Sequence, residues 1–222
     1  MATQQAKGEA FQALHEGESF LIPNPWDAGS ARILAGLGFK ALATTSSGFA
    51  FTLGRLDGKA TLDEATPLPV STDLENGYGA SPEDAALAIT RAAEAGAVGG
   101  SIEDWDAELG IYEIERATER VAAAAEAARA LDFPFTFTAR AENFVRGNPD
   151  LDDTIARLRA YEKAGADVLY APRLESIDNV RAICQAVSKP VNVLAYLVAW
   201  RMRLARKQLR ARARCRSAER GS

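Results

Sequence analysis

The sequence predicts an α/β protein built as a modified TIM (β/α)8 barrel, with about seven recognisable strands and no recognisable eighth. Short apolar runs alternate along the chain with patterns of helical period. Several of these runs hold apolar, small or β-branched residues almost throughout, which is typical of parallel strands covered on both faces. A helix ended by glycine and followed at once by a strand recurs at residues 35–38, 94–97 and 163–166. Such a succession of units favours a barrel over an open sheet.

The candidate strands follow one another at the spacing of βα units. In chain order they are residues 20–27, 41–47, 69–75, 99–104, 135–142, 168–172 and 191–195. The carboxyl ends of parallel strands meet at one mouth of a barrel, where functional residues gather. The residues that end these strands are therefore the first candidates for a site.

Helical patterns fill the intervals between the strands. Asp27 can cap a helix that begins at Ala28, and Gly38 can end it in a left-handed turn. Ser81 followed by Pro82 marks a second helix start. The clearest stripe spans residues 114–131, with apolar side chains at helical spacing; on its other faces lie Glu115, Arg116, Glu119 and Arg120.

Length and composition narrow the class of protein. The chain has 222 residues, of which 47% are hydrophobic and 25% charged, as expected for one soluble globular domain. No apolar run approaches the ~20 residues that span a bilayer, and residues 1–18 lack the build of a signal peptide. Cys184 and Cys215 are the only cysteines, too few for a disulfide framework. We therefore expect a cytoplasmic protein without a membrane partner.

Acidic residues concentrate where the candidate strands end. Asp73, Glu75 and Glu103 lie at such ends, together with Arg140. Several carboxylates at one mouth repel one another, and a divalent cation with oxygen ligands relieves that repulsion. Each acid can instead pair with a lysine or arginine or cap a helix, and Arg140 can form an ion pair with Glu142 or Glu103. The acids taken together favour the cation.

Three segments carry a family resemblance. They read S-T-D-L-E-N-G-Y-G at 71–79, S-I-E-D at 101–104 and T-A-R-A-E at 138–142. They resemble the central motifs of the phosphoenolpyruvate mutase/isocitrate lyase superfamily, and residues 20–31 and 53–58 fit the same pattern. The resemblance covers about residues 8–195.

The resemblance implies a Mg²⁺ cofactor and names its ligands. By this pattern Asp73 lies closest to Mg²⁺, and Asp57, Glu75 and Glu103 support the ion through water molecules. Mg²⁺ keeps several of its waters in proteins, which suits such an arrangement. Asp57 is also assigned, with Arg140, to the catalytic residues.

The resemblance further implies a small α-keto or α-hydroxy carboxylate substrate and a homo-oligomer, usually a tetramer. Thr45 and Ser46 match the loop that binds a substrate carboxylate or phosphonate, and Arg140 matches the arginine that holds the substrate and its developing charge. We also assign Asn192 to substrate binding. A lyase or mutase that breaks a C–C or P–C bond through an enolate-like intermediate is therefore expected, since Mg²⁺ and a guanidinium stabilise an enolate.

The loop at 104–112 departs from the family. Lyases of the superfamily carry a Lys-Lys-Cys-Gly-His type motif here, whose cysteine is the acid–base residue, but this loop has no lysine, cysteine or histidine. Isocitrate or methylisocitrate cleavage by that mechanism is not expected. Asp106 or Glu108 can serve as the catalytic acid or base, or can simply be solvated. Trp105 can be a lid residue that excludes water, or can pack against the protein. His15, the only histidine, is expected to be structural or exposed.

Two further segments differ from the family. Residues 58–69 leave room only for a shortened helix. Residues 196–222 carry eight arginines and one lysine against one glutamate and show no strand pattern. We therefore divide the chain into a barrel domain, 1–195, and an arginine-rich tail, 196–222.

These departures leave two alternatives to an active enzyme. One is a catalytically inactive, truncated barrel homologue. The other is a protein that binds a partner through its basic tail. Nucleic acid is not the expected partner, because the arginines surround the predicted helix and the aromatic residues of the tail are only Tyr196 and Trp200.

Overall fold

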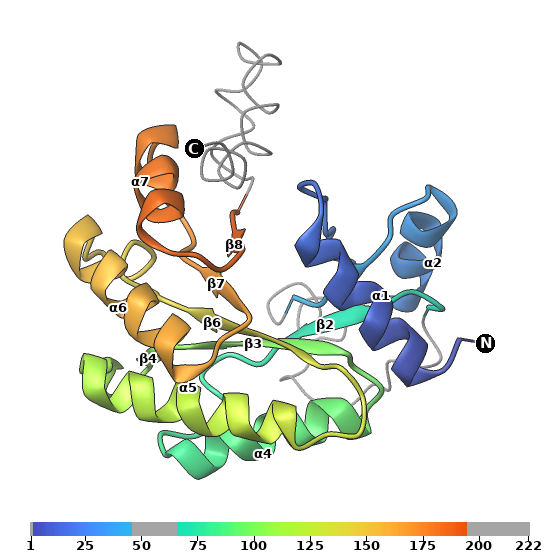
Figure 1. Ribbon diagram of the computed structural model, residues 1–222, viewed down its shortest axis with the longest axis horizontal. Coiled ribbons are helices and arrows are strands. Elements are labelled where there is room, and N and C mark those ends of the chain that lie inside the picture. The colour runs from blue at the N-terminus through green and yellow to red at the C-terminus, as the bar shows by residue number, and fades with distance from the viewer. Residues whose placement is uncertain (1, 46–65, 195–222) are drawn as a thin grey trace, which may run out of the picture.

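The computed structural model describes residues 2–45 and 66–194, and within them a curled sheet of six parallel strands (Figure 1). The strands lie in the order β1-β2-β3-β6-β7-β8, which is their order along the chain. Their bounds are β1 Leu42–Ala43, β2 Val70–Asp73, β3 Gly99–Glu103, β6 Thr136–Arg140, β7 Val168–Tyr170 and β8 Val191–Asn192. A short antiparallel hairpin, β4 Trp105–Asp106 with β5 Gly110–Ile111, follows β3. The predicted parallel α/β architecture is confirmed.

The strand predicted at residues 20–27 is wrong. This segment runs beside β1 as irregular chain, with one backbone hydrogen bond, from Ala43 N–H to Pro23 O at 3.0 Å. Pro23 and Pro25 have no N–H to donate, so the segment cannot form a regular ladder. The Asn24 side chain supplies the other contacts, donating to Ala43 O at 3.2 Å and Thr44 O at 3.3 Å.

Six helices are described, and the ends that were predicted from caps and glycines lie where they were expected. They are α1 Gln4–Glu16, α2 Ala28–Gly36, α4 Pro82–Glu94, α5 Ile114–Arg129, α6 Leu151–Ala164 and α7 Ile177–Ala186. Asp27 and Ser81 form the expected caps. Each predicted glycine joint holds a residue in the left-handed region: φ is 89° at Gly38, 94° at Gly96 and 108° at Gly165. None of the described helices is long and apolar enough to cross a membrane.

The core lies between the sheet and the helices α4 to α7, which cover its outer face in succession (Figure 1). α1 lies over the amino-terminal ends of β3 and β6. There Gln4 donates to Ala93 O and Ala97 O at 2.8 and 3.0 Å, and Gly8 lies against Pro134. His15 contacts Phe11 and Phe20 edge-on in the same layer, which confirms a structural role. Since α1 covers one end of the strands, the opposite end carries the candidate site.

Candidate active site

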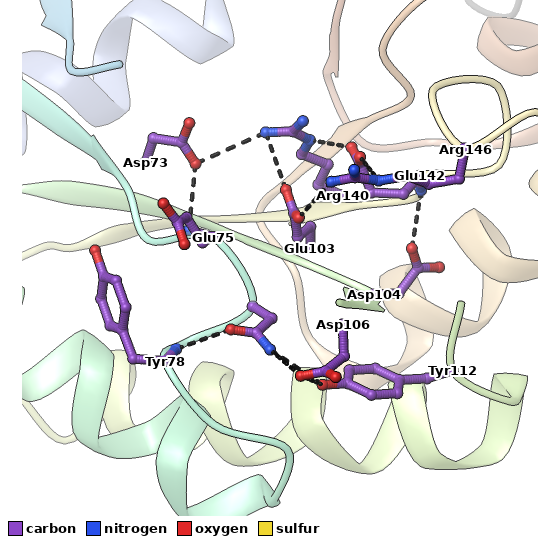
Figure 2. Close-up of polar contacts among 11 residues, drawn as sticks. Asp73, Glu75, Tyr78, Glu103, Asp104, Asp106, Tyr112, Arg140, Glu142 and Arg146 are labelled. Carbon is purple, nitrogen blue, oxygen red and sulfur yellow. Dashed lines mark hydrogen bonds and ion pairs between the residues drawn. The ribbon is translucent and has the colours of Figure 1, made fainter. Parts of the chain in front are cut away.

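Arg140 is the centre of a charged cluster at the carboxyl ends of the strands (Figure 2). Asp73 ends β2, Glu103 ends β3 and Arg140 ends β6, and Glu103 is directly in register with Arg140. The Arg140 Nη1 atom lies 3.3 Å from Glu103 Oε2 and 3.7 Å from Asp73 Oδ1. The structure thus brings together three of the residues predicted from the motifs.

Glu142 and Arg146 complete this cluster, and neither was predicted as a site residue. Glu142 has a fully buried side chain, and its Oε1 accepts from Arg140 Nε. Arg146 lies in the turn after β6, with Nε 3.0 Å from Glu142 Oε2 and Nη2 3.2 Å from Glu103 Oε1. The ion pairs considered for Arg140 are both present. The spacing of Glu142 and Arg146, four residues apart, was the available signal for the second arginine.

Burial and mutual repulsion set the electrostatics of the cluster. Burial raises the pKa of Glu103 to about 7, with Arg140 acting in the opposite direction and Glu142 and Asp73 adding to the rise. Burial also raises the pKa of Glu142 against the effect of Arg140. For Arg140 itself burial acts to lower the pKa, but the surrounding carboxylates outweigh it and raise the pKa. The site therefore favours an added positive charge.

Glu75 follows Asp73 into a tight turn. Its φ is 49°, and its backbone N–H donates to Asp73 Oδ1 at 3.3 Å. Its carbonyl accepts from Glu103 N–H at 2.8 Å, which ties the ends of β2 and β3 together. In Figure 2, Asp73 and Glu75 lie on one side of Arg140, and Glu142 and Arg146 lie on the other.

The structure describes two of the three further residues that were predicted to bind substrate, Thr45 and Asn192. Asp73 N–H donates to Thr44 Oγ1 at 2.9 Å, which puts the end of β1, with Thr45 next in the chain, beside the cluster. Asn192 pairs with Tyr170, which in turn pairs with Arg140, so Asn192 lies two strands away from that arginine. Ser46 and Asp57 lie outside the described residues. The tail at 196–222 also lies outside them, as do residues 58–65 of the segment 58–69 in which a shortened helix was predicted.

Asp104, the neighbour of Glu103, belongs to a different network. Its carboxylate accepts from Tyr161 Oη at 2.5 Å, Arg157 Nη1 at 3.2 Å and Glu142 N–H at 2.8 Å. Burial raises its pKa, and these hydrogen bonds oppose the rise. Asp104 thereby links three segments beneath the cluster: β3, helix α6 and the residues that follow β6.

Arg120 was predicted on a polar face of its helix, and its burial corrects that prediction. Its side chain is 1% exposed and donates to the carbonyls of Gly79, Ser81 and Asn76. Its guanidinium carbon lies 4.9 Å from the ring centroid of Tyr112. α5 packs against α4, so a residue off the apolar stripe still faces the loop between β2 and α4. Arg120 fixes that loop, which carries Glu75.

The donors in the cluster suit a hard cation in chemical type. They are carboxylate oxygens, the ligands that Mg²⁺ prefers. No group of three or more acidic, histidine or cysteine side chains in the described ranges converges closely enough to enclose a metal ion. Asp73 and Glu103 face the same Arg140 nitrogen, so the guanidinium matches part of their charge in the described structure.

Comparison with known proteins identifies the family. The phosphoenolpyruvate phosphomutase family matches residues 11–211. The chain belongs to the phosphoenolpyruvate mutase/isocitrate lyase superfamily. The match extends past residue 195, and the division of the chain at that point stays a prediction.

Individual members of the superfamily resemble the chain over most of its length. A crystal structure of a candidate lyase/mutase from Burkholderia cenocepacia is 56% identical, covers 86% of this chain and 73% of its own, and has a TM-score of 0.81. An uncharacterised protein of Mycobacterium tuberculosis is 32% identical over 192 residues, 81% of this chain and 71% of that protein. The 2-methylisocitrate lyase of Escherichia coli is 29% identical over 83% of this chain and 68% of its own length. Oxaloacetate acetylhydrolase, solved with its product oxalate, is 26% identical and has a TM-score of 0.73; the match covers 84% of this chain and 71% of that one.

The hairpin β4–β5 is formed by the loop at 104–112, whose sequence has no lysine, cysteine or histidine. Asp106 accepts from the backbone N–H groups of Glu108 and Leu109 at 2.8 and 3.1 Å, and from Asn76 Nδ2 at 2.9 Å. These hydrogen bonds lower its pKa and commit its carboxylate to the turn. Trp105 lies under the Arg146 guanidinium, whose carbon is 3.2 Å from a ring centroid, so the indole has a packing partner. Glu108 is exposed.

Proposed function

We propose that this chain is a Mg²⁺-dependent enzyme that makes or breaks a C–C or P–C bond next to the carbonyl of a small α-keto or α-hydroxy carboxylate. The observation that carries the proposal is the position of Arg140 at the strand ends, between Asp73 and Glu103. A guanidinium held by carboxylates at this mouth is oriented before the substrate arrives, and preorganised charge is the largest contribution to many enzymatic rates.

The proposed roles of the residues are those that the family resemblance implies. Asp73 would hold Mg²⁺ most closely, with Glu75, Glu103 and Asp57 acting through water. The bound cation supplies positive charge to an enolate oxygen. Arg140 binds the substrate carboxylate by paired hydrogen bonds and stabilises the charge that develops when the bond breaks. Thr45, Ser46 and Asn192 complete the substrate pocket.

The relatives support the substrate class. The names of 2-methylisocitrate lyase and oxaloacetate acetylhydrolase each specify a small organic acid. The hairpin β4–β5 matches none of the loops that distinguish reactions within the superfamily, so the proposal ends at the class of reaction.

A substrate panel tests the proposal. Oxaloacetate, substituted malates, methylisocitrate and phosphonopyruvate are each incubated with the full chain and Mg²⁺, and pyruvate and other enolate-derived products are measured. We expect turnover of at least one compound and its loss in Asp73→Ala. An inactive homologue predicts no turnover, together with a thermal unfolding transition that Mg²⁺ and oxalate, an enolate mimic, do not raise.

We also propose that the chain forms a homo-oligomer, a tetramer by family resemblance. Exposed apolar side chains on and just after α2 support this proposal: Ile33 is 65% exposed and Leu37 is 71% exposed. Adjacent exposed apolar residues commonly mark protein interfaces. Sedimentation equilibrium of the full chain tests the proposal, and a monomer at micromolar concentration would contradict it.

A further inference from the structure

Two arginines and two glutamates form a closed ring of alternating charge. Arg140 and Arg146 each contact both Glu103 and Glu142, and each carboxylate gives one oxygen to each guanidinium. Figure 2 shows Arg146 reaching back from its turn to this ring. The ring consists of two guanidinium groups and two carboxyl groups. Arg146 is therefore as much a part of the site as Arg140.

Arg146 is held in one orientation by groups on both sides. The indole of Trp105 lies 3.2 Å from its guanidinium carbon, and the hairpin that carries Trp105 is fixed by Asp106. The two glutamates accept from Nε and Nη2. A planar guanidinium fixed in this way loses little conformational freedom when it binds an anion.

One nitrogen of Arg146 remains available to a ligand. Within the part of the chain that the structure describes, Nη1 makes no hydrogen bond or ion pair. The Arg146 side chain is 29% exposed, against 16% for Arg140. Arg146 is therefore more exposed than Arg140 and keeps one nitrogen without a partner among the described residues.

We propose that Arg146 binds a second carboxylate of the substrate and so selects dicarboxylates over monocarboxylates. The inference rests on the proposed function, in which Arg140 holds the carboxylate next to the reacting carbonyl. One carboxylate needs only one guanidinium. A second guanidinium, fixed beside the first through shared partners, suits a second anionic group a few bonds away.

Matched ligands isolate the second carboxylate. Malate differs from lactate by one added carboxylate, so each enantiomer of malate is compared with both enantiomers of lactate by calorimetric titration of the full chain with Mg²⁺. In the wild type we expect the better malate to bind about tenfold or more tighter than lactate. In Arg146→Gln we expect this preference to fall to about one. Because Arg146 also pairs with Glu103 and Glu142, a loss shared by malate and lactate reports that positioning role, whereas the ratio of the two affinities reports the second contact.

Two further variants complete the experiment. Arg146→Lys keeps the charge but loses the planar fork, so we expect it to retain a partial preference and to remain folded if the glutamine variant does not. Arg181→Gln removes an exposed arginine that pairs with Asp178 at 2.7 Å on α7, and should leave both affinities unchanged.

The outcomes separate this inference from the proposed function. A wild type that binds lactate but shows no preference for malate overturns the role of Arg146 alone. Equal weakening of malate and lactate in both Arg146 variants also overturns it, because Arg146 then only positions Glu103 and Glu142. A wild type that binds neither ligand also overturns the role of Arg146, while turnover in the substrate panel decides the proposed function independently.

Discussion

Arg140, which is half-buried, and Arg120, which is buried, have their charges satisfied by different partners. Arg140 lies among carboxylates at the strand ends, where its charge is matched and its pKa is raised. Arg120 lies beneath the loop between β2 and α4 and donates to three backbone carbonyls, and burial lowers its pKa. Charged groups are thus concentrated where a ligand is expected. At Arg120 the partners are backbone carbonyls, and their hydrogen bonds hold the loop that carries Glu75. The comparison predicts that one arginine governs activity and the other stability.

The largest expected effect is on activity, at Arg140. Replacing Arg140 with Gln should lower kcat/KM by about 100- to 1000-fold, because it removes a preorganised donor from the developing charge. Steady-state kinetics on the substrate found in the panel measure this loss. A decrease in kcat/KM of less than about threefold would show that Arg140 does not stabilise the transition state.

The second effect is on stability, at Arg120. Arg120→Met leaves three carbonyls without their donor and should lower the free energy of unfolding by about 3 kcal/mol or more. The matched control is Arg116→Met, one turn earlier on α5, which should cost about 0.5 kcal/mol. Arg116 is exposed, and among the described residues it donates to Ala80 O at 3.2 Å and lies 5.2 Å from the ring centroid of Tyr112. Denaturant unfolding compares the two variants. Similar losses in both would show that the loop does not depend on the buried arginine.

A third effect concerns pH and the acids around Arg140. The pKa of Glu103 is about 7 in the folded protein because of burial, above the value of 4.5 for an unburied glutamate. A carboxyl whose folded pKa is raised stabilises the protein at low pH and loses that contribution as pH rises toward the folded pKa. Without Mg²⁺, stability should therefore fall by about 2 kcal/mol between pH 4.5 and 7.5. Glu103→Gln should flatten this dependence, and an unchanged slope would assign it to other groups.

The smallest effect is expected at the anchor beneath the cluster. Tyr161→Phe removes the hydroxyl that donates to Asp104, at a cost of about 1 kcal/mol. That hydroxyl favours the ionised carboxylate, so its loss raises the pKa of Asp104 further. The difference in unfolding free energy between wild type and variant should grow as pH rises, because Asp104 ionises at high pH. Unfolding at pH 5 and pH 8 measures it, and a difference that shrinks with pH would contradict the assignment.

Sequence reasoning recovered the parts of the site that depend on strand ends. Asp73, Glu103 and Arg140 each follow a short buried run, so the parallel topology alone places them at one mouth. The glycine joints and the caps at Asp27 and Ser81 were equally predictable, because their signals are local. These features depend on few neighbours.

The residues that were missed depend on packing between distant segments. Arg120 is buried because α5 lies against the loop before α4, which a single helical pattern does not reveal. Glu142 and Arg146 enter the site because a turn after β6 folds back over β3. The strand predicted at 20–27 failed because its prolines limit backbone pairing, although its apolar pattern resembles a strand.

That proline-containing segment has a consequence for solubility. An open strand edge is a template on which other chains can add strands and aggregate. Beside β1, Pro23 supplies an acceptor but no donor, and the amide of Asn24 takes up the carbonyls of Ala43 and Thr44. The segment thus covers β1 with a partner that cannot itself extend the sheet. We expect its irregularity to hinder the addition of further strands at this edge of the sheet.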